Sequence, residues 1–306
     1  MAIPEKCPLC LAESKNQSVV TSHVYGNDSN ISRAFFKCSE CEVIYQYPLL
    51  TKEEEENFYI SEFESFMASR SGKSGGWKKS EDHIKANEPT RIRRMTYLSP
   101  LLPKNGRILE VGCSSGFMLW PLIQKEYQCF GIEPSGVFSD FVKSKGLKVF
   151  NSIDDPKISD EQEKFDLIMH FFVLEHISDP LAFLQKQLSL LNKGGKLVFE
   201  IPNSSDPLYT VYDIPEFERF YWSIAHPWYF NKQSLEYLLL KLNTSFNISF
   251  DQRYDLSNHF IWAKDGKPGG MNKYSNFFSP ELEECYKKTL INNGHCDTLI
   301  VTINKS

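Results

Sequence analysis

The stretch RILEVGCSSGF at residues 107–117 decides the fold of this chain of 306 residues. A short apolar run ends there in a turn that contains Gly112 and Gly116 and opens onto a helix. Glycines at such a turn leave room for a tight bend and for a ligand to approach the backbone, and the helix N-terminus supplies free N–H groups. The stretch therefore predicts a strand, a ligand-binding turn and a helix, in the order that open α/β sheets use.

Four more apolar runs follow this one and alternate with helical stretches. Runs of this length separated by helices are typical of a parallel sheet that is covered on both faces. We therefore expect a doubly wound α/β sheet, which the strands in NISFDQRYD and DTLIVTIN complete near the C-terminus. Ligands of such sheets bind beyond the carboxyl ends of the strands. The five runs are residues 107–111, 128–133, 148–150, 165–172 and 196–201.

A carboxylate at the end of the second run makes the glycine turn more specific. Glu133 lies 23 residues after Glu110, and a carboxylate at that place can accept both hydroxyl protons of an adenosine ribose. A dinucleotide site would need a third glycine to seat its pyrophosphate, and this chain lacks that glycine. The pattern therefore indicates a nucleoside ligand without phosphates.

Two Cys-x-x-Cys pairs near the N-terminus predict a metal site. Each pair can sit on one turn and bind the same ion, and two pairs separated by 27 residues complete a tetrahedral shell for zinc. Two unrelated buried pairs or a redox motif are the alternatives, although redox motifs normally occur singly. A closed shell of four thiolates leaves no position for substrate, so the zinc would be structural. The four ligands are Cys7, Cys10, Cys38 and Cys41.

Charge and composition argue against several classes of protein. Lysine and arginine number 34 against 39 aspartates and glutamates, so a net charge of -5 favours neither nucleic acid nor an anionic membrane as partner. No apolar run of about 18 residues appears, and the first residues lack the apolar stretch of a secretory signal. We therefore expect a cytoplasmic protein of about two domains.

The sequence divides into three parts. Residues 1–60 contain the cysteine pairs and form the expected zinc-binding module. Residues 61–88 are polar, as in SRSGKSGGWKKS, and are consistent with either a linker or a lid over a bound substrate. Regular periodicity begins at about Pro89, so residues 89–306 form the expected α/β domain, with substrate-binding elements in its C-terminal part.

Four motifs follow one another in the order of a known family. ILEVGCSSGFM, GIEPS, FDLIMHFFVLEHISDP and LLNKGGKLVFEIPN, within residues 90–205, resemble the class I S-adenosylmethionine-dependent methyltransferases. The resemblance implies a Rossmann-like sheet of seven strands and S-adenosylmethionine as cofactor. It implies that Glu133 holds the ribose and that Asp154, or else Asp155, lies near the adenine. The implied lining of the methionine part is Glu110, Gly112, Cys113, Ser114 and Gly116, and the implied closing residues are His170 and Phe171.

The cysteine pattern, with a Tyr-x-x-Pro-like strand behind it, resembles a subgroup of this family that modifies sugars and includes zinc-containing deoxysugar methyltransferases. This resemblance implies a small-molecule acceptor, namely a sugar or a sugar nucleotide. The chain is shorter than the larger sugar C-methyltransferases, so a carbon acceptor does not follow. Methylation of a carboxylate, an amine or a phosphate-linked group of a secondary metabolite is an alternative. A zinc-bearing module that binds protein or RNA without turnover is another.

Methyl transfer requires an aligned acceptor and, where a proton must leave, a base. His226 is the first candidate base, because it lies in the aromatic stretch 217–230, whose rings could stack on a sugar. Its His-x-x-Tyr-Phe pattern is also similar to that of sugar methyltransferases. His176, which follows Glu175 after the fourth run, and Tyr221 are further candidates. The alternatives are structural: the Glu-His pair could position the next helix, and the aromatic stretch could be core.

Overall fold

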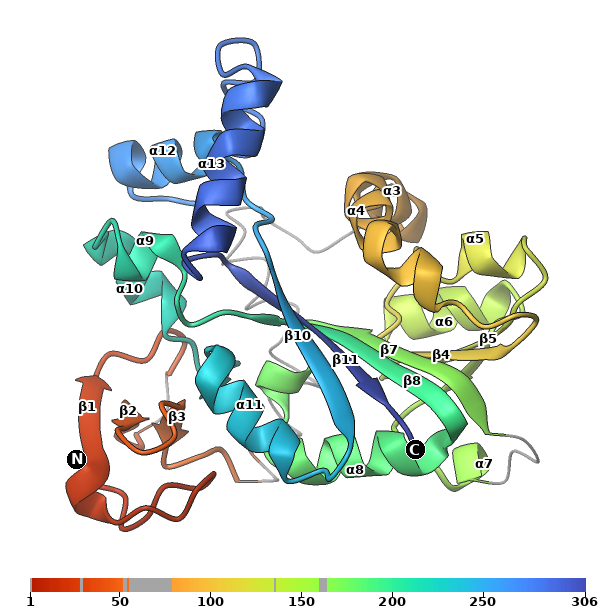
Figure 1. Cartoon of the computed structure of the whole chain (residues 1–306), viewed down its shortest axis with the longest axis horizontal. Coiled ribbons are helices and arrows are strands. Elements are labelled where there is room, and N and C mark those ends of the chain that lie inside the picture. The colour runs from red at the N-terminus through yellow and green to blue at the C-terminus, as the bar shows by residue number, and fades with distance from the viewer. Residues whose placement is uncertain (1, 28–29, 52–53, 55–78, 135, 160–163) are drawn as a thin grey trace.

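A computed structural model describes residues 2–27, 30–51, 54, 79–134, 136–159 and 164–306. These residues form two sheets, one of four strands and one of seven. Figure 1 shows the smaller sheet beside the N-terminus and the larger one at the centre of the molecule. The segment 61–78, most of the predicted linker or lid, lies outside the described residues. No helix in the described ranges is both long and apolar enough to cross a bilayer.

The central sheet has the strand order β10-β11-β8-β7-β4-β5-β6. Strands β4 to β8 run parallel, and β11 is antiparallel to both of its neighbours. The chain returns from β6 to β7 on the other side of β4, so the strand order reverses at β4. The predicted doubly wound, Rossmann-like sheet of seven strands is therefore confirmed. The strands are β4 (Arg107–Val111), β5 (Gln128–Ile132), β6 (Lys148–Phe150), β7 (Phe165–Phe171), β8 (Leu191–Pro202), β10 (Ser245–Asp251) and β11 (Thr298–Asn304).

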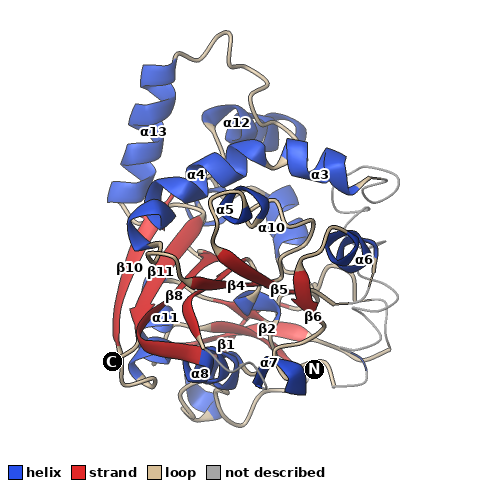
Figure 2. Cartoon of the chain, turned by 90° about the vertical axis from the view of Figure 1, so that its right-hand side faces the viewer, coloured by secondary structure: helices blue, strands red, loops and turns tan. Residues whose placement is uncertain are grey.

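Helices cover both faces of this sheet because neighbouring strand residues point to opposite sides. Ile108 belongs to a buried apolar cluster with Leu122, whereas Leu109 belongs to a different one with Leu184. Figure 2 shows the two helical layers above and below the strands. The first layer holds α4 (Glu88–Leu98), η3 (Ser99–Leu101), α5 (Trp120–Ile123) and α6 (Val137–Ser144), and the second α7 (Pro156–Ser159), α8 (Pro180–Leu190) and α11 (Lys232–Leu240).

The smaller sheet takes one of its strands from far along the chain. Its order is β1-β2-β3-β9, and Ile44 of β3 pairs with Tyr229 of β9. A strand edge with unpaired backbone groups is stabilised when another strand covers it. Residues 228–229 therefore add a strand to the sheet of the predicted module, residues 1–60. A strand of two residues is too short to leave a periodic pattern in the sequence. The elements are η1 (Ser14–Asn16), β1 (Gln17–Thr21), β2 (Ala34–Cys38), β3 (Ile44–Tyr47) and β9 (Trp228–Tyr229).

Helical structure begins before the residue that periodicity indicates. A helix, α3 (Ser80–Ala86), precedes α4 and contacts both α4 and α6. The last part of the segment predicted as linker or lid is therefore ordered helix. Its seven residues, SEDHIKA, include one large apolar side chain and show no amphipathic pattern.

The remaining helices follow strands that end at one edge of the central sheet. Figure 1 shows α12 and α13, which lie between β10 and β11 in the chain, projecting away from the sheet. A one-turn 3₁₀ helix, η4, follows β7 at this edge. These elements are η4 (Leu174–His176), α9 (Pro207–Thr210), α10 (Pro215–Tyr221), α12 (Leu256–Asp265) and α13 (Pro280–Asn292).

A buried carboxylate ties α4 to the sheet. Glu200 of β8 is fully buried, and it accepts hydrogen bonds from Arg94 Nε at 2.9 Å and from the Tyr97 hydroxyl at 2.8 Å. Arg93 lies 2.6 Å from the same carboxylate. Burial alone would raise the pKa of Glu200, but the charges of Arg94 and Arg93 outweigh it and hold this pKa below its usual range.

Removing this carboxylate is expected to destabilise the fold strongly. We predict that Glu200→Ala lowers the free energy of unfolding by about 3–5 kcal/mol, because two arginines lose their buried partner. Urea unfolding followed by circular dichroism measures the change. Glu284→Ala is the matched control, since it breaks an exposed ion pair with Lys288 and should have little effect. Equal effects of the two substitutions would contradict the prediction.

Candidate functional site

The turn after β4 has the backbone geometry that the glycines predicted. Gly112 and Gly116 have φ angles of +72° and +74°, which residues with a side chain rarely adopt. A Cβ atom on Gly112 would lie 2.9 Å from Cγ2 of Val173, which follows β7. The Gly112 backbone therefore packs against the Val173 side chain at the edge where β4 and β7 finish.

Glu133, just beyond the end of β5, is joined to this turn. Its Oε2 atom accepts a hydrogen bond from the Ser114 N–H at 2.7 Å. Burial raises the pKa of Glu133 to about 7, although the Ser114 N–H acts in the opposite direction. The structure thus brings together the glycine turn and the carboxylate that sequence analysis treated as one site.

The other residues predicted around the turn differ in what they present. Glu110 is buried, and burial raises its pKa well above the usual range against the opposing charge of Arg94. Cys113 is also buried, and its Sγ lies 2.5 Å from where a Cβ on Gly131 would be, so its sulfur packs against the next strand. Ser114 offers its main-chain N–H to Glu133. Any contribution of Cys113 to a ligand would come from its backbone.

His83 of α3 also contacts the turn, and sequence analysis missed it. Its Nδ1 lies 2.8 Å from the Ser115 hydroxyl, and its ring lies 4.7 Å from that of Phe138 and 5.7 Å from that of Phe117. Burial lowers the pKa of His83 to about 4, so the ring is neutral at neutral pH. The contact places α3 directly over the predicted ligand-binding turn. No sequence signal marks it, because the residue stands in a polar stretch.

His170 and Phe171, predicted to close the site after β7, point to opposite faces of the sheet. His170 is fully buried and stacks on Phe199 with ring centres 4.6 Å apart. Its imidazole therefore packs in the core, so any contact of His170 with a ligand would come from its backbone. Phe171 is half-buried on the other face, where the Arg94 guanidinium lies 3.9 Å from its ring centre.

Asp154 and Asp155, the predicted adenine neighbours, lie in the loop before α7. Asp154 is exposed, and its carboxylate is 3.9 Å from Lys186 Nζ. Asp155 accepts a hydrogen bond from the Lys157 N–H at 3.0 Å. Both carboxylates therefore have partners in the protein, and neither contacts the glycine turn in the described residues.

Two of the candidate catalytic residues meet, although they are far apart in the sequence. The rings of His176 and His226 are nearly perpendicular, with centres 4.6 Å apart. Buried Glu175 joins them, and one ligand atom of each of the three lies within 4.8 Å of the others. His176 Nδ1 donates to the Ala225 carbonyl at 2.7 Å, so in the neutral ring the lone pair is on Nε2. This arrangement can accept a proton and stabilise the resulting positive charge.

Tyr221, the third candidate, lies in the core. It is buried, and its hydroxyl donates to the Asn203 carbonyl at 3.3 Å. Its ring lies 5.0 Å from that of Trp222 and 4.8 Å from that of Tyr229, in a cluster that also includes Phe35 of β2. The structural alternative therefore describes most of the aromatic stretch 217–230, which packs against the smaller sheet.

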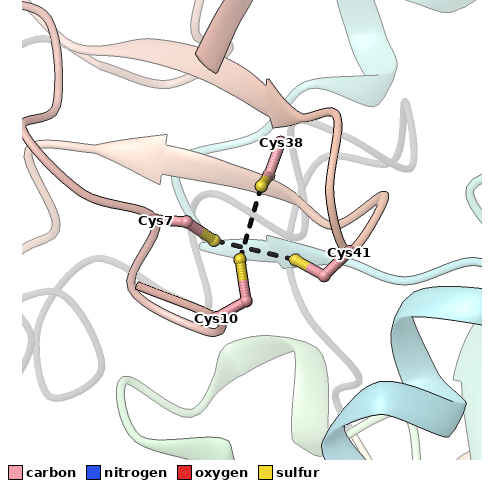
Figure 3. Close-up of side chains that lie close together, drawn as sticks. All are labelled: Cys7, Cys10, Cys38 and Cys41. Carbon is pink, nitrogen blue, oxygen red and sulfur yellow. Dashed lines mark hydrogen bonds between the residues drawn. The ribbon is translucent and has the colours of Figure 1, made fainter. Parts of the chain in front are cut away.

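The four N-terminal cysteines converge on one point, as Figure 3 shows. The Cys7 and Cys41 sulfurs are 3.7 Å apart, and those of Cys10 and Cys38 are 3.5 Å apart. All four lie within 4.8 Å of one another. Zinc–thiolate bonds of about 2.3 Å in a tetrahedron place sulfurs about 3.8 Å apart. The donor set and its spacing therefore fit a zinc ion.

The sheet topology defines the class of the central part as a Rossmann-like domain, and the glycine turn and the carboxylate beyond β5 form a candidate ligand site at its switch point. A family model described as a methyltransferase domain matches residues 85–245, and the chain belongs to this family. The family that the motifs resemble is thereby confirmed at the level of the domain.

Curated relatives match the chain over part of their length. A tRNA U34 carboxymethyltransferase of Alteromonas mediterranea is 33% identical over 110 residues, which are 32% of this chain and 32% of that protein. A ubiquinone biosynthesis O-methyltransferase of Pelagibacter ubique is 28% identical over 96 residues, 30% of this chain and 40% of that protein. The chain thus matches about a third of the length of the first relative and two fifths of the second.

Among solved structures, a SAM-dependent methyltransferase from Archaeoglobus fulgidus is similar to this chain. The two share 17% sequence identity with a TM-score of 0.49, over 79% of this chain and 99% of that one.

Proposed function

We propose that this protein transfers a methyl group from S-adenosylmethionine to a small-molecule acceptor. The observation that supports the proposal is the hydrogen bond between the Glu133 carboxylate and the glycine turn at Ser114. It lies at the carboxyl ends of β4 and β5, within the methyltransferase domain. Carboxylates at this position accept ribose hydroxyls in nucleoside sites, and the turn leaves the backbone accessible.

The residues at this edge fit the cofactor, which supplies a methyl group already activated by a sulfonium. Glu133 is the proposed residue that binds the ribose. Because its carboxylate is buried and has lost hydrogen bonds to water, the two ribose hydroxyls would replace those hydrogen bonds. The positive φ angles of Gly112 and Gly116 keep the turn tight beside it. The proposed lining of the methionine part is Glu110, Gly112, Cys113, Ser114 and Gly116.

We infer that His226 accepts the proton that leaves the acceptor. The ring of His176, fixed by the Ala225 carbonyl, packs edge-on against it, and buried Glu175 lies beside both. A carboxylate next to an imidazole stabilises the imidazolium that forms when the imidazole takes a proton. His176 follows β7 in the same loop as Val173, whose side chain lies against Gly112 of the ligand-binding turn.

A sugar or sugar nucleotide is the proposed acceptor, because the cysteine pattern and the His-x-x-Tyr-Phe segment resemble those of sugar methyltransferases. The names of the two curated relatives mention tRNA and ubiquinone biosynthesis instead. The compounds tested as methyl acceptors must therefore include sugar nucleotides, free sugars, phenols and tRNA.

Turnover by a His226 variant tests the proposal. With an acceptor found by measuring S-adenosylhomocysteine formation, we predict that His226→Asn lowers kcat by about 10²–10⁴-fold, the usual contribution of a general base. Binding of S-adenosylhomocysteine, measured by calorimetry, should be unchanged in this variant. His23→Asn, on the exposed loop after β1, is the control. Full turnover by His226→Asn would remove the proposed base, and no turnover by the parent on any acceptor would count against the activity.

We also propose that the four cysteines bind one structural zinc ion. The geometry of the sulfurs supports this, and the four ligands would leave no open position for substrate. Cys38 and Cys41 flank the turn between β2 and β3, and β3 carries β9. The ion would therefore stabilise the strand that follows His226.

Metal analysis tests this assignment. We predict one zinc per chain in the purified protein, and its loss in Cys38→Ser together with a lower unfolding temperature. Cys285→Ser, at an exposed cysteine of α13, should keep the zinc. Purified parent without zinc, or full zinc content in Cys38→Ser, would refute the site.

A further inference from the structure

Arg253 stands at the ligand-binding edge of the central sheet. It follows β10, whose last residue, Asp251, pairs with Thr298, and Thr298 pairs with Pro202 at the end of β8. Two antiparallel pairings make β10 parallel to β8. Arg253 therefore lies at the same edge as the carboxyl ends of β4, β7 and β8, where ligands of such sheets bind.

Asp297 and Phe172 hold the guanidinium in place. Asp297, which is buried, accepts a hydrogen bond from Arg253 Nε at 3.2 Å and from the main-chain N–H groups of Arg253 and Tyr254 at 3.0 and 2.9 Å. The guanidinium carbon lies 3.9 Å from the ring centre of Phe172. A carboxylate at one end and an aromatic face below restrict an arginine before any ligand arrives.

The far end of the Arg253 side chain reaches solvent. The side chain is 26% exposed, whereas that of Asp297 is 1% exposed. Asp297 Oδ2 is occupied by the main-chain N–H groups and by Gln252 Nε2 at 2.8 Å, so the arginine is held through Nε and Oδ1. Within the described ranges we find no hydrogen bond from its two terminal nitrogens. Those nitrogens carry N–H groups that match the oxygens of a carboxylate or phosphate.

This arginine is also near the proposed acceptor site. Phe172, on which it stacks, precedes Glu175 by three residues, a span of at most about 10 Å even in an extended chain. Val173, the first of the two residues between them, lies against Gly112 of the ligand-binding turn. A series of contacts therefore links Arg253, through Phe172 and the residues that follow it, to the group of Glu175, His176 and His226. The nearby Arg93 and Arg94 are already paired with Glu200.

We propose that Arg253 forms an anion subsite of the acceptor pocket and selects acceptors that carry a carboxylate or a phosphate group. The terminal nitrogens donate hydrogen bonds to two oxygens of that group while Asp297 and Phe172 keep the guanidinium oriented. This inference rests on the proposed function, because it names a chemical feature of the acceptor.

Anion binding tests the subsite without a known acceptor. The protein is titrated with inorganic phosphate and, separately, with acetate, in the presence of S-adenosylhomocysteine and at ionic strength fixed with chloride, and thermal unfolding is followed. We expect one of the two anions to raise the unfolding temperature of the parent, and which one does so distinguishes phosphate from carboxylate. In Arg253→Gln the affinity should fall at least about tenfold, since charge-assisted hydrogen bonds are lost.

Two further variants make the outcome decisive. Arg219→Gln, at an exposed arginine of α10, should bind the anion as the parent does. Arg253→Lys keeps the positive charge but loses the two terminal N–H-bearing nitrogens of the guanidinium. This variant should bind the anion severalfold more weakly than the parent. Binding of neither anion by the parent, or parent-like binding by Arg253→Gln, overturns the proposal. If Arg253→Gln does not fold, parent-like binding by Arg253→Lys overturns it instead.

The kinetic consequence separates this inference from the proposed function. With pairs of acceptors that differ in one anionic group, such as a sugar phosphate and its free sugar, Arg253→Gln should raise KM for the anionic member about tenfold or more and leave the neutral member unchanged. Equal effects on both members would overturn the selectivity. Failure of the parent to bind S-adenosylhomocysteine would count against the proposed function, whereas the anion titration reports on Arg253 itself.

Discussion

The hydrogen bond from the Ser114 N–H to the Glu133 carboxylate is the contact on which the site depends. It joins the turn after β4 to the end of β5, and so fixes the edge of the sheet at its switch point. It also holds an acid in a place where burial raises its pKa to about 7. Ligand groups that donate hydrogen bonds to the carboxylate would favour its charged form, so ligand binding and ionisation of Glu133 are coupled.

The smaller sheet is connected to this same edge of the central sheet. β9 pairs with β3, and Phe230, the next residue, forms a bridge with Asn203 after β8. His226 stands just before β9 and contacts His176 after β7. The cysteine cluster, the smaller sheet and the histidine pair are therefore one connected arrangement. The N-terminal region holds a proposed catalytic group in place as well as folding around its own cysteines.

The sequence predicts the structural features that come from a repeating pattern or a fixed spacing of residues. It does not predict the features that depend on contacts between distant segments of the chain. The run 107–111 is a strand because apolar residues that are buried on both faces leave a continuous pattern. That same continuity conceals which face of the sheet a residue takes, so the sequence does not show that the His170 side chain points into the core. The meeting of His176 and His226 depends on the pairing of β9, and His83 stands in a polar helix without periodicity.

Calorimetric titration with S-adenosylhomocysteine, from pH 8 down to below pH 7, tests the central claim most directly. Because free Glu133 has a pKa of about 7, the account predicts binding by the parent that weakens toward acid, by up to about tenfold per pH unit. Glu133→Gln should bind at least about tenfold more weakly, with little dependence on pH, and Glu126→Gln at an exposed site should behave as the parent. No binding by the parent, or parent-like affinity in Glu133→Gln, would contradict the account.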